Sequence, residues 1–428
     1  MRITLFTIGA RGDTQPFVAL AARLKHEGHR VKLAARPDFA GLAEEYGVEF
    51  APLGHPYQPF ITGAAEAAAL GSGNVFNQLR YGWQQRHYVF DQVHEDEWRA
   101  AQGAQAIIYK YSWTAGYTIA EKLGIPCAAA MLFPLTPTRA FPSFLLGRGV
   151  DHGPLLNRLV WTISQQVVVW QLQRREDNAL RRDLRLRPLP FFGGPYARQA
   201  REEMPVYYAY SPTVLPCPAD WPERMQVTGY WFLDPPPGWQ APDVLLQFLR
   251  AGPPPVSIGF GSMASRDADA TLRLVLEALE LSGQRGVLLS GWAGLGKDHA
   301  LPEYAFAADN LPHSWLFPQM AAVVHHGGAG TTGAGLRSGV PSILVPLTAD
   351  QPSWARMLHA LGVGPAPIPF QTLTAERLAS AIRQAVSDPA MRQRAADLGK
   401  RIQEEDGLSR ATESFTRYVE QVGAARNQ

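Results

Sequence analysis

A glycine-rich turn in the second half of the chain carries the residue types best suited to bind a phosphate. The run HHGGAGTT at residues 325–332 follows an apolar stretch, residues 321–324, and opens a segment of helical character that ends near Gly339. In such a strand–turn–helix unit, bare backbone N–H groups and the positive end of the helix dipole converge on one point. The pattern therefore predicts an anion site, with two histidines where the strand ends.

A carboxylate and a carboxamide follow the next expected strand. Asp350 and Gln351 come just after the apolar run at residues 342–347. These side chains suit a polyol, because each can make bidentate hydrogen bonds that distinguish between orientations of hydroxyl groups. Together with the glycine turn, they predict a phosphate with a sugar beside it.

A second candidate for chemistry lies near the N-terminus, in the run GARGDTQP at residues 9–16. Here a strand ends, a glycine turn follows, and Asp13 is presented before a helix with Pro16 as its expected first residue. Residues at the carboxyl ends of parallel strands face the ligand crevice of such folds. Asp13 is then a general base or a helix cap, and the residues alone favour the cap. Arg11 is a possible surface partner for it.

Expected strands and helices alternate along both halves of the chain, and these elements must position the candidate residues. Strands are expected in the first half at residues 2–8, 29–35, 104–111, 125–132, 206–210 and 225–230. In the second half they are expected at residues 256–261, 286–290, 304–307, 321–325 and 342–347, with a short one near 365–368. This alternation is typical of parallel, doubly wound α/β sheets.

A proline-rich piece, residues 234–242, divides the two alternations and is interpreted as a linker. The expected domains are residues 1–233 and 243–405, followed by a final helix within 406–428 that has no strand after it and is expected to pack on the first domain. Two aromatic-rich segments, about 56–101 and 139–199, interrupt the first alternation. The second contains an arginine run, which is either a solvated helix face or a rim that touches a membrane surface. Its members are Arg174, Arg175, Arg181, Arg182, Arg185 and Arg187.

The bulk composition excludes several classes of protein. With 428 residues, 46% hydrophobic and 18% charged, the chain can build two ordinary globular domains. A net charge of +2 gives no reason to expect a nucleic-acid partner. Two cysteines cannot form a disulfide framework, so a reducing, cytoplasmic setting is expected. The N-terminal apolar run is too short for a signal peptide, and no apolar run reaches the length of a membrane span.

Three stretches of the chain, residues 9–20, 256–263 and 311–351, resemble the nucleotide-sugar-dependent glycosyltransferases of the GT-B class, family 1. The likeness is strongest to the bacterial branch that includes sterol and glycopeptide-antibiotic glycosyltransferases. The resemblance implies two Rossmann-like domains facing a donor/acceptor cleft. It also implies inverting transfer of a hexose, with glucose favoured, from a UDP- or TDP-sugar to a hydroxyl of a small apolar acceptor such as a sterol, polyketide or phenolic.

The resemblance also assigns roles to single residues. Asp13 stands where many relatives have the histidine of a His-x-x-Pro motif, which implies that Asp13 is the general base. The implied donor-binding residues are Gly12, Ser262, Trp292, His313, His326, Gly328, Gly330, Thr331, Asp350 and Gln351. The expected acceptor pocket contains Phe76, Trp83 and Phe133. No cofactor or metal is expected, because His326 and the helix N-terminus can stabilise the departing diphosphate.

Some features depart from the pattern and keep other classes open. Ala334 replaces a ribose-binding glutamate of plant relatives, and residues 310–313 lack their base-stacking tryptophan, so the donor base is not specified. Residues 328–333 also form a Gly-x-Gly-x-x-Gly run, which an NAD-dependent oxidoreductase would use. That fingerprint normally opens its domain at the first strand, which disfavours this alternative. A nucleotide-sugar epimerase or hydrolase and a non-catalytic nucleotide-sugar-binding protein are the remaining alternatives.

Overall fold

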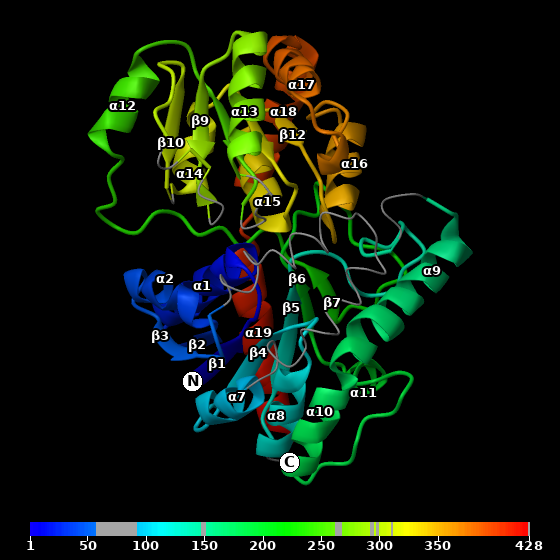
Figure 1. Ribbon diagram of the computed structural model, residues 1–428. Coiled ribbons are helices and arrows are strands. Elements are labelled where there is room, and N and C mark those ends of the chain that lie inside the picture. Colours follow the sequence, from blue (N-terminus) through cyan, green and yellow to red (C-terminus); the bar gives the residue numbers. More distant parts are fainter. Residues whose placement is uncertain are drawn as a thin grey trace. The chain divides into compact units, whose positions relative to one another are not determined.

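The chain folds into two α/β units, each built on its own parallel sheet (Figure 1). The computed structural model describes residues 1–56, 92–146, 151–261, 268–291, 295–296, 299–309 and 311–426. Among these, the first unit comprises residues up to 233 and from 405 onward, and the second comprises 234–404.

The sheet of the first unit has seven parallel strands in the order β3-β2-β1-β4-β5-β6-β7. The strands are β1 (Arg2–Phe6), β2 (Arg30–Ala35), β3 (Glu49–Pro52), β4 (Ala106–Lys110), β5 (Cys127–Met131), β6 (Val206–Tyr208) and β7 (Met225–Val227). The six strands expected from the sequence are confirmed, each shorter at its ends. The sequence did not reveal β3, whose four residues are partly or fully exposed at the sheet edge and lack an apolar run.

Helices cover both faces of this sheet, as a buried parallel sheet requires. They are α1 (Arg11–His26), α2 (Ala40–Glu45), α7 (Val93–Ala100), α8 (Ala115–Leu123), α9 (Pro154–Ile163), the π-helical η2 (Ser164–Trp170), α10 (Gln171–Asp183), α11 (Tyr196–Arg201) and α19 (Gly407–Arg426). The C-terminal helix α19 lies against α1, where Arg23 donates to the Ser409 hydroxyl over 2.6 Å and Thr412 donates to Glu27 over 2.8 Å.

The expected start of the first helix at Pro16 is wrong. Helix α1 begins at Arg11, with Ala10 as its N-cap, so Pro16 lies inside the helix. Proline has no N–H and cannot bond the carbonyl four residues earlier, which here belongs to Gly12. Gly12 is exposed, so water can hydrate that carbonyl and the interior proline is tolerated. As a result, Asp13 lies in the first helical turn instead of in a loop before the helix.

The sheet of the second unit has five parallel strands in the order β10-β9-β8-β11-β12. They are β8 (Val256–Gly259), β9 (Gly286–Leu289), β10 (Ala305–Ala308), β11 (Ala322–His325) and β12 (Ser342–Leu344). Around it lie α12 (Asp243–Arg250), α13 (Ala268–Ser282), α14 (His313–Leu316), α15 (Ala329–Ser338), α16 (Gln351–Ala360), α17 (Ala375–Ser387) and α18 (Pro389–Gln403). The apolar faces of α13 and α17 pack on this sheet through residues such as Val275, Leu279, Leu378 and Ile382.

The short strand expected near residues 365–368 is absent from the structure, where this stretch has no regular secondary structure. Pro365 and Pro367 both lack an N–H, so they cannot donate to a sheet ladder. Ile368 makes one bond to the sheet, from its N–H to the Leu344 carbonyl at 3.0 Å. The sheet therefore ends at β12.

Candidate functional site

The carboxylate of Asp13 lies at the carboxyl end of β1 in the first unit and contacts two other groups. Its Oδ1 forms an ion pair with Lys110 Nζ at 2.7 Å, and the same ammonium donates to the Ile8 carbonyl at 2.9 Å. Its Oδ2 accepts a hydrogen bond from the Ala10 N–H at 3.2 Å. Asp13 therefore caps the start of α1 from the third helical position, and the lysine holds it from the other side.

Gly9 makes room for this carboxylate. Its φ of +144° is a conformation that side chains other than glycine rarely adopt, and a Cβ on Gly9 would lie 2.1 Å from Asp13 Oδ2. The glycine before the helix thus allows the Asp13 side chain to fold back over the end of β1.

Lys110 was not identified from the sequence, which offered only Arg11 as a partner for Asp13. The visible signal was a lysine at the end of an otherwise apolar strand, in the run AIIYK of β4. Because β4 pairs with β1, the last residue of one strand lies beside the loop that leaves the other. Arg11, the partner suggested by proximity in sequence, donates to Gln15 instead, at 3.1 Å.

Of the three expected acceptor-pocket residues, the structure describes only Phe133. It is half-buried and follows β5, at the same end of the sheet as Asp13. Phe76 and Trp83 lie outside the described residues, as do two of the expected donor-binding residues, Ser262 and Trp292.

In the second unit, the glycine-rich run forms the expected strand–turn–helix. Strand β11 ends at His325, Gly327 takes a φ of +90°, and Gly328 is the N-cap of α15. The first helical bond runs from the Thr332 N–H to the Gly328 carbonyl at 2.9 Å. The preceding N–H groups, including those of Gly330 and Thr331, have no partner within the helix and are available to an anion.

The two adjacent histidines have different environments. His325 is buried, and its Nδ1 accepts from the Gly327 N–H at 3.1 Å, which stabilises the turn. The pKa of His325 is lowered well below its usual value by burial and then by the neighbouring His326 and His313. His326 keeps part of its surface accessible, although its Nδ1 is buried and has no hydrogen-bond partner among the described residues.

Glycines on two elements enclose the His326 ring. A Cβ on Gly261 would lie 2.6 Å from its Cε1, and a Cβ on Gly328 would lie 2.6 Å from its Nε2. Burial lowers the pKa of His326 to about 4. The ring is therefore neutral at neutral pH and carries one N–H to donate.

The pKa of His326 leads to a prediction for stability. A histidine in the unfolded chain has a pKa of about 6.5, so between that value and about 4 the unfolded state binds more protons than the folded state. Stability from this residue is present above pH 6.5 and is lost as the pH falls toward 4. When the pH is lowered from 7 to 5, we expect the free energy of unfolding to fall by about 1 to 2 kcal/mol more in the wild type than in His326→Gln. Urea unfolding at both pH values measures this difference. Equal losses of unfolding free energy in the two proteins would contradict the lowered pKa of His326.

Asp350 and Gln351 lie at the start of α16, next to the glycine turn. A Cβ on Gly327 would lie 3.3 Å from the Gln351 carbonyl, so the two motifs are in contact. Gln351 Oε1 accepts from the N–H groups of Leu347 at 2.8 Å and Thr348 at 3.2 Å. The buried indole of Trp354, which the sequence did not single out, donates to Asp350 Oδ2 at 2.8 Å. These bonds fix the orientation of both side chains at the carboxyl end of β12.

His313 is the first residue of the short helix α14. Its ring stacks on Phe317, with ring centroids 4.4 Å apart and an interplanar angle of 13°. Helix α14 packs against α15, the helix that follows the glycine turn. Of the expected donor-binding residues described in the second unit, those from His326 to Gln351 follow the carboxyl ends of β11 and β12, and His313 lies on a neighbouring helix.

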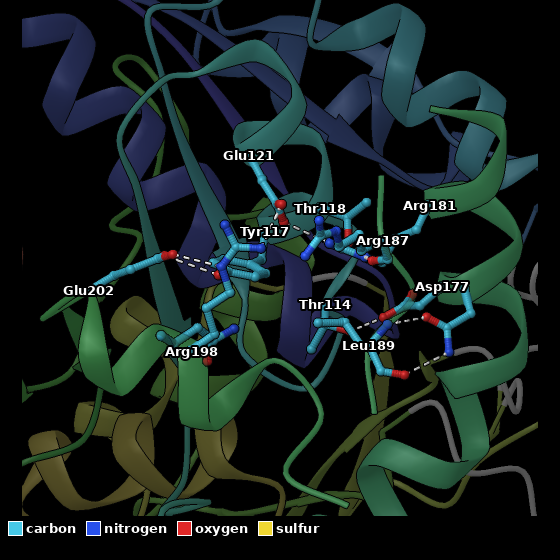
Figure 2. A network of polar contacts seen from close by, with 12 residues as sticks. Thr114, Tyr117, Thr118, Glu121, Asp177, Arg181, Arg187, Leu189, Arg198 and Glu202 are labelled. Atoms are coloured by element: carbon cyan, nitrogen blue, oxygen red, sulfur yellow. Dashed lines mark hydrogen bonds and ion pairs between the residues drawn. The ribbon is translucent and has the colours of Figure 1, made fainter. Parts of the chain in front are cut away.

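The arginine run, which begins on α10 and continues into the loop after it, is not a single solvated face. Arg181 is buried and forms an ion pair with Glu121 at 2.8 Å, while its Nε donates to the Arg187 carbonyl at 2.7 Å. Glu121 also accepts from Arg198 on α11 at 2.6 Å (Figure 2). This network ties α10 and α11 to α8, so Arg181 has a structural role inside the unit.

Two family models match the chain. The glycosyltransferase family 28 N-terminal domain matches residues 3–142, and the erythromycin biosynthesis protein CIII-like C-terminal domain matches residues 294–408. Among the described residues, no helix is both long enough and apolar enough to cross a membrane.

Curated relatives align over nearly the whole chain. A sterol 3-beta-glucosyltransferase of Arabidopsis thaliana is 35% identical over 98% of this chain and 68% of its own length. The O-mycaminosyltylonolide 6-deoxyallosyltransferase of Streptomyces fradiae is 36% identical over 98% of both chains. The chain spans 66–68% of two Arabidopsis sterol glucosyltransferases and 27–34% of several fungal ones.

The fold agrees with solved structures of the same class. The glycosyltransferase VinC, solved in complex with dTDP, superposes with a TM-score of 0.64 at 20% identity, covering 98% of this chain and 100% of that chain. Two Rossmann-like units of this kind define the GT-B fold. The chain belongs to the glycosyltransferase family that contains these sterol and macrolide enzymes.

Proposed function

We propose that the protein transfers a hexose, glucose by preference, from a UDP- or TDP-sugar to a hydroxyl of a small apolar acceptor, with inversion at the anomeric carbon. The acceptor class is a sterol or a polyketide such as a macrolide, which are the substrates named for its relatives, or a phenolic. The observation that carries the proposal is the contact between the glycine turn at Gly327 and Gln351, the residue that follows Asp350. This contact supports a donor site in which a phosphate at the turn lies beside side chains suited to sugar hydroxyls.

Two groups of residues supply the chemistry in this scheme. The acceptor oxygen attacks the anomeric carbon of the donor sugar, and Asp13 accepts the proton from that oxygen as the new bond forms. Negative charge develops on the departing diphosphate, where the N–H groups at the start of α15 and the neutral His326 ring can donate to it. A single displacement inverts the configuration, so an α-linked donor yields a β-glycoside. No protein-bound cofactor or metal is required in this scheme.

Lys110 has a positioning role in the scheme. Its ion pair with Asp13 Oδ1, together with the Ala10 N–H on Oδ2, restrains both carboxylate oxygens of the base. A base must be within hydrogen-bonding reach of the proton that it removes, so loss of this restraint affects the reaction step more than substrate binding.

We expect Lys110→Met to lower kcat about 10- to 100-fold with little change in the KM for the donor. Lys110→Arg should restore much of the rate. A matched control is Lys32→Met, since Lys32 lies on β2 of the same sheet and pairs with Glu49 at 3.2 Å. Equal values of kcat and of the donor KM for the two methionine variants, or no recovery in Lys110→Arg, would remove Lys110 from the mechanism.

The function itself is tested by release of nucleoside diphosphate from UDP-glucose and dTDP-glucose, with a panel of sterol, macrolide and phenolic acceptors. Release that depends on the acceptor, with a β-glycoside identified by NMR, is the expected result. Release that ignores the acceptor would indicate a hydrolase or an epimerase instead. Binding of the donor without turnover would indicate a non-catalytic nucleotide-sugar-binding protein, and NAD binding an oxidoreductase.

A further inference from the structure

An exposed apolar stripe runs along α9 and the π-helical turn that follows it. Leu155, Leu159, Ile163 and Val167 are spaced four residues apart and are 74%, 54%, 41% and 53% exposed, and the adjacent Leu156 is 50% exposed. Residues four apart are neighbours on a helix surface. We call these five residues the α9 stripe. Isolated exposed leucines are ordinary, but a contiguous row of them marks a surface that meets a partner.

The opposite face of the same helix is firmly packed, so the α9 stripe is not a misplaced core. The Trp161 indole donates to the Phe141 carbonyl at 2.9 Å and stacks on Phe144. The hydroxyls of Ser164 and Ser143 are 2.6 Å apart. These contacts hold α9 against residues 141–144, in the segment that follows β5, and leave the stripe facing outward.

Two aromatic rings add to this apolar surface. Phe191 and Phe192 are 52% and 73% exposed, with ring centroids 4.8 Å apart. Their loop is tied to the C-terminal end of the same helical run, because the Trp170 indole donates to the Phe191 carbonyl at 3.0 Å. The Gly193 N–H also donates to Gln166 Oε1, at 2.8 Å.

The charges around the apolar surface are mainly positive. Between residues 151 and 194, six arginines are exposed or half-buried, against three acidic side chains. The arginines are Arg158, Arg174, Arg175, Arg182, Arg185 and Arg187. The Arg174 guanidinium lies over the Phe191 ring, with its central carbon 4.8 Å from the ring centroid. This contact joins a cationic side chain directly to the exposed aromatic pair.

We propose that the α9 stripe, with Phe191 and Phe192, inserts into the interface of an anionic lipid bilayer while the surrounding arginines contact lipid phosphates. Helices that lie in a membrane interface combine an apolar face with flanking basic residues in this way. A second copy of the chain fits less well, because a two-fold interface would oppose one arginine-rich surface to another. The arrangement would bring the unit that carries Asp13 to the phase in which an apolar acceptor dissolves.

The test is cosedimentation of the purified protein with phosphatidylcholine vesicles, with and without phosphatidylglycerol. We expect binding to the anionic vesicles that weakens as salt is raised. Two double variants, Leu155→Gln with Leu159→Gln and Arg182→Gln with Arg185→Gln, should each lower the partition constant about 10-fold or more. Leu281→Gln on α13 is the matched control, since Leu281 is 48% exposed and lies in the other unit. It should bind as the wild type does.

Several results would overturn the proposal. One is a wild type that does not bind anionic vesicles, and another is a leucine variant that binds as well as Leu281→Gln. A third is a dimer in sedimentation velocity that the leucine variant converts to a monomer, because the stripe would then be a protein interface. Circular dichroism and nucleoside diphosphate binding verify that each variant is folded. Vesicle binding requires no turnover, so its outcome is independent of the proposed glycosyl transfer.

Discussion

Asp13→Asn is expected to lower kcat about 100- to 10,000-fold, the range over which general bases contribute to catalysis. An asparagine oxygen can still accept the Ala10 N–H bond that Asp13 Oδ2 accepts at 3.2 Å, so the start of α1 should remain folded. The carboxamide cannot take a proton from the acceptor, and the ion pair with Lys110 is lost. The measurement is acceptor-dependent release of nucleoside diphosphate, with donor affinity determined separately by calorimetry.

The control for this variant must separate the base from the helix cap. The free energy of unfolding of the first unit, measured by thermal unfolding, should change by about 1 kcal/mol or less. The substitution keeps the capping oxygen and removes only its charge. Donor affinity should be unchanged. A large loss of stability with a proportional loss of activity would mean that Asp13 is a structural cap, and an unchanged rate would exclude it as the base.

His326→Ala should lower kcat about 100- to 1000-fold, the usual effect of removing one donor to a developing negative charge. The His326 ring is enclosed by Gly261 and Gly328, so a donated N–H is held in a fixed direction. Donor binding should also weaken, since in the proposed function the same group contacts the donor phosphate before the reaction. Single-turnover kinetics with UDP-glucose and dTDP-glucose would measure both effects.

His359→Ala is the matched control, because this histidine is exposed on α16 of the same unit. Its kinetics should equal those of the wild type. If His326→Ala weakened donor binding without affecting kcat, His326 would contribute to affinity alone, and the helix N-terminus would carry the stabilisation of the leaving group. An unaltered rate and affinity would place the diphosphate elsewhere.

The strand–turn–helix unit around Gly327 could be predicted from the sequence because all of its parts are neighbours in the chain. The apolar residues of β11, the glycines that follow and the αL-conformation Gly339 that ends α15 lie within one short stretch. Periodicity and glycine placement are sufficient to predict such a unit. The fold class follows from the repetition of the same pattern along both halves.

The surroundings of Asp13 could not be predicted from the neighbouring residues in the sequence. The sequence indicated a carboxylate near a helix start, but it suggested Pro16 as the first helical residue and Arg11 as a neighbour for the charge. The helix in fact begins five residues earlier, at Arg11, and the ion pair is made with Lys110, 97 positions away in the chain. Pairing between β1 and β4 creates that contact, and the residues around Asp13 do not indicate this pairing.

The sequence by itself determined the parallel α/β class, the strand–turn–helix unit at the glycine-rich run and the candidate residues at the strand ends, since each depends on neighbouring positions. Only the tertiary structure decided which of these residues share a site and which are structural. In the folded chain, Gly327 contacts Gln351 and Asp13 forms an ion pair with Lys110. Arg181 is buried against Glu121, whereas the α9 stripe is exposed. Burial and long-range pairing depend on the packing of distant elements, and no local pattern of residue types specifies them.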